Sequence, residues 1–271
     1  MIQLEVKNIS KHFGGIEAIR ELGFQVKAGE IVALIGPNGA GKSTVFNCIN
    51  GIYRPEGGSI LFQGKNLIGL KPHRIARLGI ARTFQNIALF RNLTVLENLL
   101  LGCNPSLSAG VLRGGLFYGR ALREELESRR RVEEIIDFLE IEKYRKKPVG
   151  ALPFGVQKRV ELGRALAMKP QLLLLDEPVA GMNEEETEDM ARFIIDIQEE
   201  LGLSILIVEH DMGVVMDISD RVVVINFGVK IAEGVPADIV RNPLVIQAYL
   251  GERGGFRAAG AEPPSFTGAA S

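Results

Sequence analysis

The clearest chemistry in this sequence lies in a glycine-rich stretch that ends in a lysine and two hydroxyl side chains. Its residues are Gly36, Pro37, Asn38, Gly39, Ala40, Gly41, Lys42, Ser43 and Thr44. This order fits the phosphate-binding pattern G-x-x-x-x-G-K-S/T. The glycines let the backbone turn so that successive N–H groups point at phosphate oxygens, and Lys42 supplies a charge for the β- and γ-phosphates. The Ser43 hydroxyl can ligate Mg²⁺, so the stretch predicts a site for a nucleoside triphosphate.

A second candidate is a pair of acids that follows a run of leucines. Leu172 to Leu175 predicts a strand buried in a parallel sheet, with Asp176 and Glu177 at its carboxyl end. One acid can hold Mg²⁺ on a nucleotide, and its neighbour can act on water. The alternative is that the two acids only begin a polar turn. A phosphate loop in the same chain favours the chemical role.

Three isolated residues can complete such a site, although each has an ordinary structural alternative. Phe13 precedes two glycines and can stack on a purine base or fold onto a sheet as a loop aromatic. Gln85 follows the predicted strand Ile80 to Phe84, where α/β proteins bind ligands, but polar loop residues are common there. His210 follows the predicted buried strand Ser204 to Val208, and a lone histidine at such a place is either functional or structural.

The elements that must position these residues alternate between strands and helices. Ile31 to Ile35 is a short apolar run that predicts a buried strand before the phosphate loop, and the residues after the loop suit a helix. Ile2 to Val6 alternates as a strand does. Thr94 and Glu97 form a capping-box pattern at the start of one helix, and Gln157 to Met168 suits another. These patterns predict an α/β fold with a mostly parallel sheet.

Composition excludes several classes of protein. The formal net charge is −1, which gives no electrostatic reason to expect nucleic acid as a partner. Cys48 and Cys103 are the only cysteines and stand apart, which argues against a disulfide framework or a zinc site and suits a reducing cytosol. No run reaches the roughly 18 apolar residues that span a bilayer, so we expect any membrane link to come through a partner. Residues 252–271 have the composition of a disordered tail.

Taken together and in their order, these motifs resemble the ATP-binding cassette (ABC) ATPases, the subunits that supply energy to ABC transporters. The resemblance covers about residues 1–251. The stretches that carry it are residues 36–44 as Walker A, 82–86 as the Q-loop, 152–157 as the signature, 172–177 as Walker B, 180–183 as the D-loop, 209–211 as the H-loop, and Phe13 as the aromatic A-loop residue.

The resemblance implies both an architecture and a reaction. The architecture is an α/β P-loop NTPase cassette with a mostly parallel sheet, an antiparallel β subdomain and a helical subdomain at about residues 87–160. The reaction is ATP hydrolysis between two cassettes that face each other head to tail. By this resemblance Ser43, Gln85 and Asp176 organise Mg²⁺.

The resemblance also assigns the remaining roles. Glu177 polarises the attacking water and His210 contacts the γ-phosphate, whereas Gln85 acts on Mg²⁺ partly through a water molecule. Lys42 and the loop amides hold the β- and γ-phosphates. Gly155 offers its backbone N–H to ATP on the opposite cassette.

A closer likeness is to the ATPases of branched-chain amino-acid importers, through the Gly/Leu-rich residues 102–119 and the ending Gly228 to Glu252. It implies membrane permease subunits, a second ABC ATPase chain and, indirectly, a solute-binding protein as partners. It also implies a peripheral location on the cytoplasmic face of the inner membrane. Substrate identity resides in the partner subunits, so the amino-acid assignment is an analogy.

Two other classes remain as alternatives. A soluble ABC ATPase of the repair kind carries long heptad insertions, and the ribosome-associated kind carries two cassettes in one chain; neither feature occurs here. A P-loop kinase leaves Leu152 to Gln157 and His210 unexplained. Ile87, Leu89, Phe90 and Leu93 are apolar residues in a loop-like stretch, and they either form a permease groove or belong to the core of the helical lobe.

The signature is the one clear departure from the family pattern. The family has Leu-Ser-Gly-Gly-Gln, and this chain has Leu152, Pro153, Phe154, Gly155 and Val156. Pro153 has neither the serine hydroxyl nor an N–H group, so it removes a donor to the nucleotide on the opposite cassette. We therefore expect a heterodimer with a cassette that carries its own signature, with a homodimer as the alternative.

Overall fold

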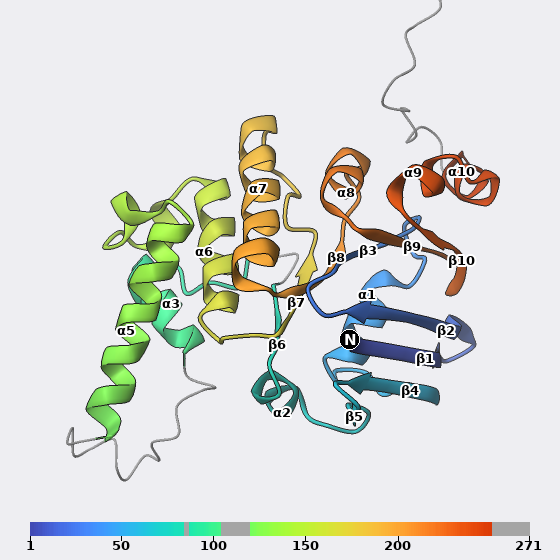
Figure 1. The fold of residues 1–271 in the computed structure, drawn as a ribbon, viewed down its shortest axis with the longest axis horizontal. Coiled ribbons are helices and arrows are strands. Elements are labelled where there is room, and N and C mark those ends of the chain that lie inside the picture. The colour runs from blue at the N-terminus through green and yellow to red at the C-terminus, as the bar shows by residue number, and fades with distance from the viewer. Residues whose placement is uncertain (84–86, 104–119, 251–271) are drawn as a thin grey trace, which may run out of the picture.

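The computed structural model describes residues 1–83, 87–103 and 120–250 (Figure 1). The predicted tail at 252–271 and most of the Gly/Leu-rich stretch therefore lie outside the described residues. A six-stranded sheet lies at the centre, with a group of helices on one side of it and a smaller sheet on the other. The predicted α/β class is confirmed.

The central sheet has the strand order β10-β9-β3-β8-β7-β6. Its neighbours pair in parallel except β10, which runs antiparallel to β9 at the edge. The predicted buried strands before the phosphate loop and before the acid pair are β3 and β7, and all of their residues are buried. The strand bounds are β3 Ile31–Ile35, β6 Ile80–Arg82, β7 Leu172–Asp176, β8 Ser204–Val208, β9 Arg221–Asn226 and β10 Val229–Gly234.

Alternate residues of these strands point into two separate hydrophobic clusters. Ile31 and Ala33 of β3 face the helices on one side of the sheet, whereas Val32 and Leu34 face helix α1 (Lys42–Ile49) and the smaller sheet on the other. This division follows from the period of two in a strand. Because both faces are covered, β3 is apolar along its whole length and β7 is apolar up to Asp176, as buried parallel strands usually are.

The smaller sheet is antiparallel and has the order β2-β1-β4-β5. The predicted strand Ile2 to Val6 is too short, because β1 continues to Phe13 through pairing with β2 and β4. The register shifts after Val6, so the period of two breaks there and the pattern no longer signals a strand. The bounds are β1 Ile2–Phe13, β2 Ile16–Lys27, β4 Gly57–Phe62 and β5 Lys65–Asn66.

The helices fall into groups along the chain. Helix α1 (Lys42–Ile49) lies between the two sheets, and the described residues between 87 and 171 contain α3, α5 and α6 but no strand. The predicted capping box at the start of α3 is confirmed, because the Thr94 hydroxyl accepts from Glu97 N and the Glu97 carboxylate accepts from Thr94 N. The remaining bounds are α2 Pro72–Arg77, α3 Val95–Gly102, α5 Arg120–Phe138, α6 Phe154–Leu166, α7 Glu184–Leu201, α8 Met212–Ile218, α9 Pro236–Val240 and α10 Pro243–Leu250.

The structure corrects one expectation in the helical region and decides between the two alternatives for one residue, Leu89. Helix α6 begins at Phe154, three residues before the predicted Gln157, with Pro153 as its N-cap in an extended conformation (φ = −52°, ψ = 151°). Leu89 is only 9% exposed and belongs to the core, whereas its neighbour Phe90 is 57% exposed. Of the residues expected to line a permease groove, Leu89 therefore does not have a free surface.

Candidate functional site

The phosphate loop occupies residues 36–41, between the end of β3 and the start of α1. Its glycines Gly36, Gly39 and Gly41 all have positive φ angles of 155°, 76° and 105°. A Cβ atom on Gly36 would lie 2.0 Å from the carbonyl oxygen of Ile225, so no other residue fits there. The loop is thus shaped by contact with β9 as well as by its own sequence.

Lys42 is the first residue of α1 and is 6% exposed. Its Nζ donates to the carbonyl oxygens of Gly36 at 2.6 Å and Pro37 at 3.0 Å. No side chain caps the N-terminus of α1, so the first amides of this helix keep their capacity to donate to an anion. Ser43, the next residue, is exposed at the same end of the helix. This arrangement fits a phosphate group.

The carboxylate at the end of β7 is already paired. Asp176 Oδ2 accepts from Arg82 Nη2 at 2.7 Å, and both side chains are more than nine-tenths buried. Arg82 ends the neighbouring strand β6, and its Nη1 also donates to Asn47 Oδ1 of α1 at 2.7 Å. Arg82 therefore links Asp176 to the helix that follows the phosphate loop. Gln85, the predicted ligand in this segment, lies outside the described residues.

Glu177 and His210 meet although they follow different strands. Glu177 Oε1 lies 2.8 Å from His210 Nε2, and the two residues are 33 positions apart in the sequence. Glu177 has φ = +50°, an uncommon conformation for a residue with a side chain. Its backbone N–H donates to Val208 O at 2.8 Å, so the end of β8 helps to hold it there. The two predicted catalytic residues thus share one place at the edge of the sheet.

Lys158 lies on helix α6, which begins within the signature, and it contacts Glu177. Lys158 is 3% exposed, and its Nζ donates to the carbonyl oxygen of Glu177 at 3.2 Å. The same ammonium lies 5.9 Å from the centre of the Phe154 ring. The position of the backbone at Glu177 therefore depends on α6.

Glu209 forms hydrogen bonds with the two segments that carry Glu177 and His210. Its Oε1 accepts from Val179 N at 3.0 Å and its Oε2 accepts from His210 N at 2.8 Å. The side chain is 3% exposed, and burial raises the pKa of its carboxyl although these backbone donors act in the opposite direction. Glu209 therefore fixes the segment after Glu177 relative to the segment that carries His210.

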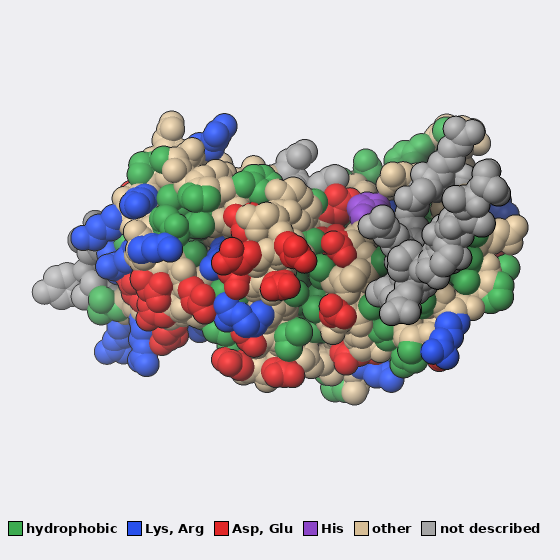
Figure 2. All heavy atoms as spheres, turned by 90° about the horizontal axis from the view of Figure 1, so that it is seen from above, with side chains coloured by type: hydrophobic (Ala, Val, Ile, Leu, Met, Phe, Trp, Pro, Cys, Tyr) green, Lys and Arg blue, Asp and Glu red, His purple; other side chains and the backbone are tan. Residues whose placement is uncertain are grey.

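The start of α6 presents Gly155 and an exposed aromatic ring. Phe154 is 43% exposed, and its ring lies 3.2 Å from the place where a Cβ on Gly181 would stand. A Cβ on Gly155 would lie 2.3 Å from Glu186 Oε1, so a larger residue there would require the Glu186 side chain to move. Glu186 belongs to the acidic first turn of α7, and acidic side chains gather over that helix in Figure 2. Acids at this end complement the helix dipole.

Phe13 ends β1 and remains 41% exposed. Its ring meets that of Tyr53 edge to face at a centroid distance of 5.0 Å, and Lys11 Nζ lies 5.2 Å from its centre. Phe13 therefore lies at the end of a strand, where its ring contacts Tyr53 and Lys11, and it is not part of an isolated turn.

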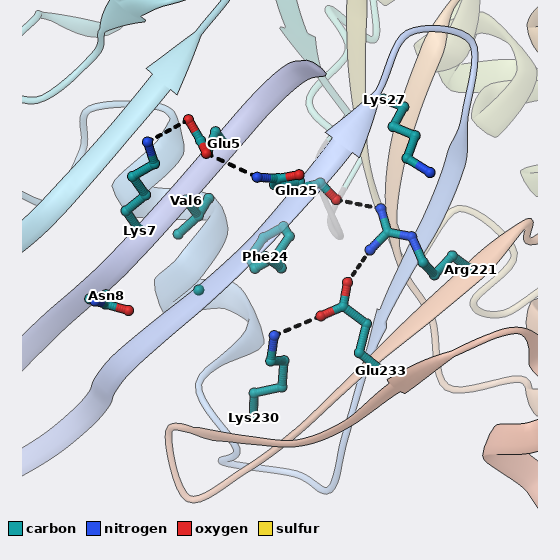
Figure 3. Close-up of a pocket in the computed structure, with 11 residues that line it drawn as sticks. Glu5, Val6, Lys7, Asn8, Phe24, Gln25, Lys27, Arg221, Lys230 and Glu233 are labelled. Carbon is teal, nitrogen blue, oxygen red and sulfur yellow. Dashed lines mark hydrogen bonds and ion pairs between the residues drawn. The ribbon is translucent and has the colours of Figure 1, made fainter. Parts of the chain in front are cut away.

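A separate polar groove of about 550 Å³ lies between the β1–β2 pair and the β9–β10 pair (Figure 3). Arg221 bonds Glu30 at 2.9 Å and also pairs with Glu233, which accepts from Lys230 at 2.6 Å. No residue of the phosphate loop lines this groove. Arg221 Nη2 also donates to the carbonyl oxygen of Gln25 on β2 at 2.7 Å, and this hydrogen bond joins the two sheets. The groove is not the nucleotide site.

Sequence patterns did not single out Arg82, Lys158, Glu209 or Glu186 as parts of this site. Arg82 lies within the stretch that resembles the Q-loop, and Glu209 within the stretch that resembles the H-loop. These motifs pointed to the right segments, but the partners of both residues are distant in the sequence and could not be predicted. Lys158 and Glu186 carried no signal of their own. Only the packing of α6 and α7 against the ends of β7 and β8 brings them close to Glu177 and Gly155.

Comparison with known proteins agrees with this geometry. Residues 19–180 match the ABC transporter family, and residues 229–254 match the family described as branched-chain amino acid ATP-binding cassette transporter. The chain is 42% identical over 250 residues to the high-affinity branched-chain amino acid transport ATP-binding protein BraF of Pseudomonas aeruginosa, covering 92% of this chain and 98% of that one. It is 41% identical over 249 residues to the protein LivG of Escherichia coli, with the same coverage.

Solved structures show the same fold. A nucleotide-free ATP-binding cassette from an ABC transporter superposes with a TM-score of 0.81 at 33% identity, covering 93% of this chain and all of that one. A dimeric, post-hydrolysis cassette bound to ADP and phosphate superposes with a TM-score of 0.72 at 26% identity, covering 86% and 98%. These matches agree with the phosphate loop and with the adjacent acids Asp176 and Glu177. The chain therefore belongs to the ABC transporter family, as an ATP-binding cassette of that family.

Proposed function

We propose that this chain is the ATP-hydrolysing subunit of an importer for branched-chain or related amino acids. It acts as a peripheral protein on the cytoplasmic face of the inner membrane, held there by permease subunits that receive the amino acid from a solute-binding protein. The printed functions of BraF and LivG and the match over residues 229–254 support the amino-acid assignment. Among the described residues, every helix is too short or too polar to cross a bilayer.

The contact between Glu177 and His210, at the same edge of the sheet as the phosphate loop, is the observation that carries the proposed reaction. Lys42 and the loop amides hold the β- and γ-phosphates of ATP. Glu177 takes up the proton of the attacking water, and His210 contacts the γ-phosphate. Phe13 offers its exposed face to the adenine ring. Positioning and charge stabilisation supply most of the catalysis in such a site.

The donor set also fits Mg²⁺. The Ser43 hydroxyl and the Asp176 carboxylate are oxygen ligands, and Mg²⁺ is usually bound by one or two carboxylates together with substrate phosphates. Gln85 is the third proposed ligand. When bound, Mg²⁺ neutralises charge on the phosphate oxygens. The ion pair with Arg82 orients the Asp176 carboxylate.

Reconstitution tests the proposed function directly. Proteoliposomes that contain this chain and the subunits that co-purify with it from native membrane should take up labelled leucine only when ATP is supplied on the cassette side. The alternative is a soluble ABC ATPase without a membrane partner. It is supported if the chain hydrolyses ATP but stays off the membrane when permease subunits are co-expressed.

We expect Phe90→Asp to weaken binding to the permease at least tenfold without unfolding the cassette. Phe90 is 57% exposed, and its loop is fixed because Phe90 N donates to the buried Asn98 Oδ1 at 2.9 Å. An exposed substitution of this kind changes the free energy of unfolding by about 0.5 kcal/mol or less. The matched control is Leu126→Asp, since Leu126 is 58% exposed on α5. A large loss of thermal stability in Phe90→Asp alone would show that Phe90 belongs to the core.

We expect Lys158→Met to lower kcat for ATP about tenfold while KM changes little. The substitution removes a charged donor to Glu177 O, and such a hydrogen bond contributes about 1.5–3 kcal/mol. The nucleotide itself is held elsewhere, so binding should persist. Lys158→Arg should recover part of the rate, and Lys146→Met is the control on an exposed lysine. Equal losses in kcat and in ATP affinity would contradict a role in positioning Glu177.

We propose a heterodimer of two different cassettes as the working unit, because Pro153 cannot donate a hydroxyl to the opposite nucleotide. A hydrogen bond to a charged acceptor contributes about 1.5–3 kcal/mol, roughly a tenfold to hundredfold effect on closure. We expect the chain alone to hydrolyse ATP more slowly than the chain mixed with its partner cassette. If the lone chain dimerises and turns over as fast as the mixture, and Pro153→Ser changes nothing, the homodimer is the working unit.

A further inference from the structure

An uncharged, largely apolar groove lies directly beside the phosphate loop. It has a volume of about 450 Å³, and we call it the C-terminal groove. Its lining includes Pro37 and Asn38 of the loop, Phe227 of the β9–β10 turn, Ile231 of β10, and Leu244 and Gln247 of α10. No charged side chain lines it within residues 1–83, 87–103 and 120–250. An occupant should therefore be uncharged and present apolar side chains, with the Asn38 and Gln247 amides as polar contacts.

Two large apolar residues of this groove face solvent. Phe227 is 83% exposed and Leu244 is 56% exposed. Phe227 also has φ = +45°, a conformation that residues with large side chains seldom adopt. Its ring belongs to neither hydrophobic cluster of the described chain. A strained aromatic residue held away from the core is typical of a contact surface.

The groove is firmly attached to the phosphate loop. Gly228 N, in the same turn as Phe227, donates to Ala40 O of the loop at 2.9 Å. A Cβ on Gly228 would lie 2.7 Å from Ala18 O, so the turn also packs tightly on β2. Anything that fills the groove therefore touches the loop that holds the nucleotide.

We propose that the C-terminal groove binds an apolar segment of the second cassette in the ATP-bound dimer. This rests on the proposed function, in which the opposite cassette covers the phosphate loop. A chain that covers this loop comes up to Pro37 and Asn38, which form one wall of the groove. The interface between the cassettes therefore continues from the nucleotide onto Phe227 and Leu244. Ile231, Leu244 and Gln247 lie within residues 229–254, the segment matched by the branched-chain family.

The test measures ATP-driven dimer formation by sedimentation. Every protein in this test carries Glu177→Gln, which should keep ATP bound in the dimer. Each variant is mixed with the cassette that co-purifies with this chain. If no cassette co-purifies, the variant is measured alone. Leu244→Asp should raise the dissociation constant of the dimer at least tenfold. Leu201→Asp is the matched control, because Leu201 is 51% exposed at the end of α7 and does not line the groove. ATP binding by the monomer should be the same in every variant.

Hydrogen exchange provides a second measurement that does not depend on a substitution. Residues 226–231 and 243–250 should gain protection in the dimer and not in the ATP-bound monomer, and a chain that ends at Leu250 should keep this gain. Protection that is lost on this truncation would identify residues 251–271 as the occupant and overturn the proposal. Equal dimer formation by Leu244→Asp and Leu201→Asp would also overturn it. A chain that fails to bind ATP would instead contradict the proposed function.

Discussion

Replacing Glu177 with glutamine should reduce ATP turnover by about 100- to 10,000-fold, which is the usual contribution of a general base. The amide cannot take a proton from water, but it has nearly the shape of the carboxylate and can still accept a hydrogen bond from His210, which lies 2.8 Å from Glu177 Oε1. ATP affinity should remain, because Lys42 and the loop amides lie on a different element. A long-lived ATP-bound dimer should therefore accumulate.

Steady-state phosphate release and equilibrium binding of a fluorescent ATP analogue measure the two halves of this expectation. The control is Glu184→Gln, an exposed acid in the first turn of α7 that should leave turnover unchanged. If Glu177→Gln hydrolyses ATP within about twofold of the unaltered chain, Glu177 does not act on water and another group must do so.

Replacing Asp176 with asparagine should give the second large effect, a loss of turnover of roughly 100- to 1000-fold. Contact between a metal ion and the reacting phosphate contributes several kcal/mol, and each 1.4 kcal/mol is a factor of ten in rate. An amide is a poorer ligand for Mg²⁺ than a carboxylate, so the Mg²⁺ concentration needed for half-maximal activity should rise. ATP binding without Mg²⁺ should change much less.

The same substitution should also lower thermal stability. Asp176 is paired with Arg82 in the interior, and breaking a buried pair from one side costs about 3–5 kcal/mol. Asparagine still accepts one hydrogen bond and Asn47 still accepts from Arg82, so we expect the loss to fall below that range. Thermal unfolding of the nucleotide-free chain measures it, with Asp196→Asn on α7 as the control. Unchanged Mg²⁺ dependence would remove Asp176 from the metal site.

The Arg82–Asp176 ion pair is a feature of the site that the sequence motifs do not reveal. The proposed Mg²⁺ ligand is held by an arginine of the neighbouring strand. Because Arg82 lies in the segment that resembles the Q-loop, this contact links that segment directly to the Asp176 carboxylate. The pairing of β6 with β7 places the two residues together.

The sequence by itself determined the parts of this protein whose signal is local. The phosphate loop is set by glycines at positions that require positive φ, and the strands before it and before Asp176 are set by uninterrupted apolar runs. The capping box at Thr94 depends on two side chains three residues apart. Each of these features has its signal in residues close together in the chain, so a pattern is enough to predict it.

Only the tertiary structure decided which distant residues meet. Arg82 and Asp176 are 94 positions apart, and Val179 and Glu209 are 30 apart. The strand order β7-β8-β3-β9 brings the carboxyl ends of separate strands to one edge, and hydrogen bonds between strands extend β1 to Phe13 where the alternation has ended. Contacts such as Lys158 with Glu177 arise from the packing of a helix against that edge, and no local pattern encodes them because their free energy is gained only when the layers assemble.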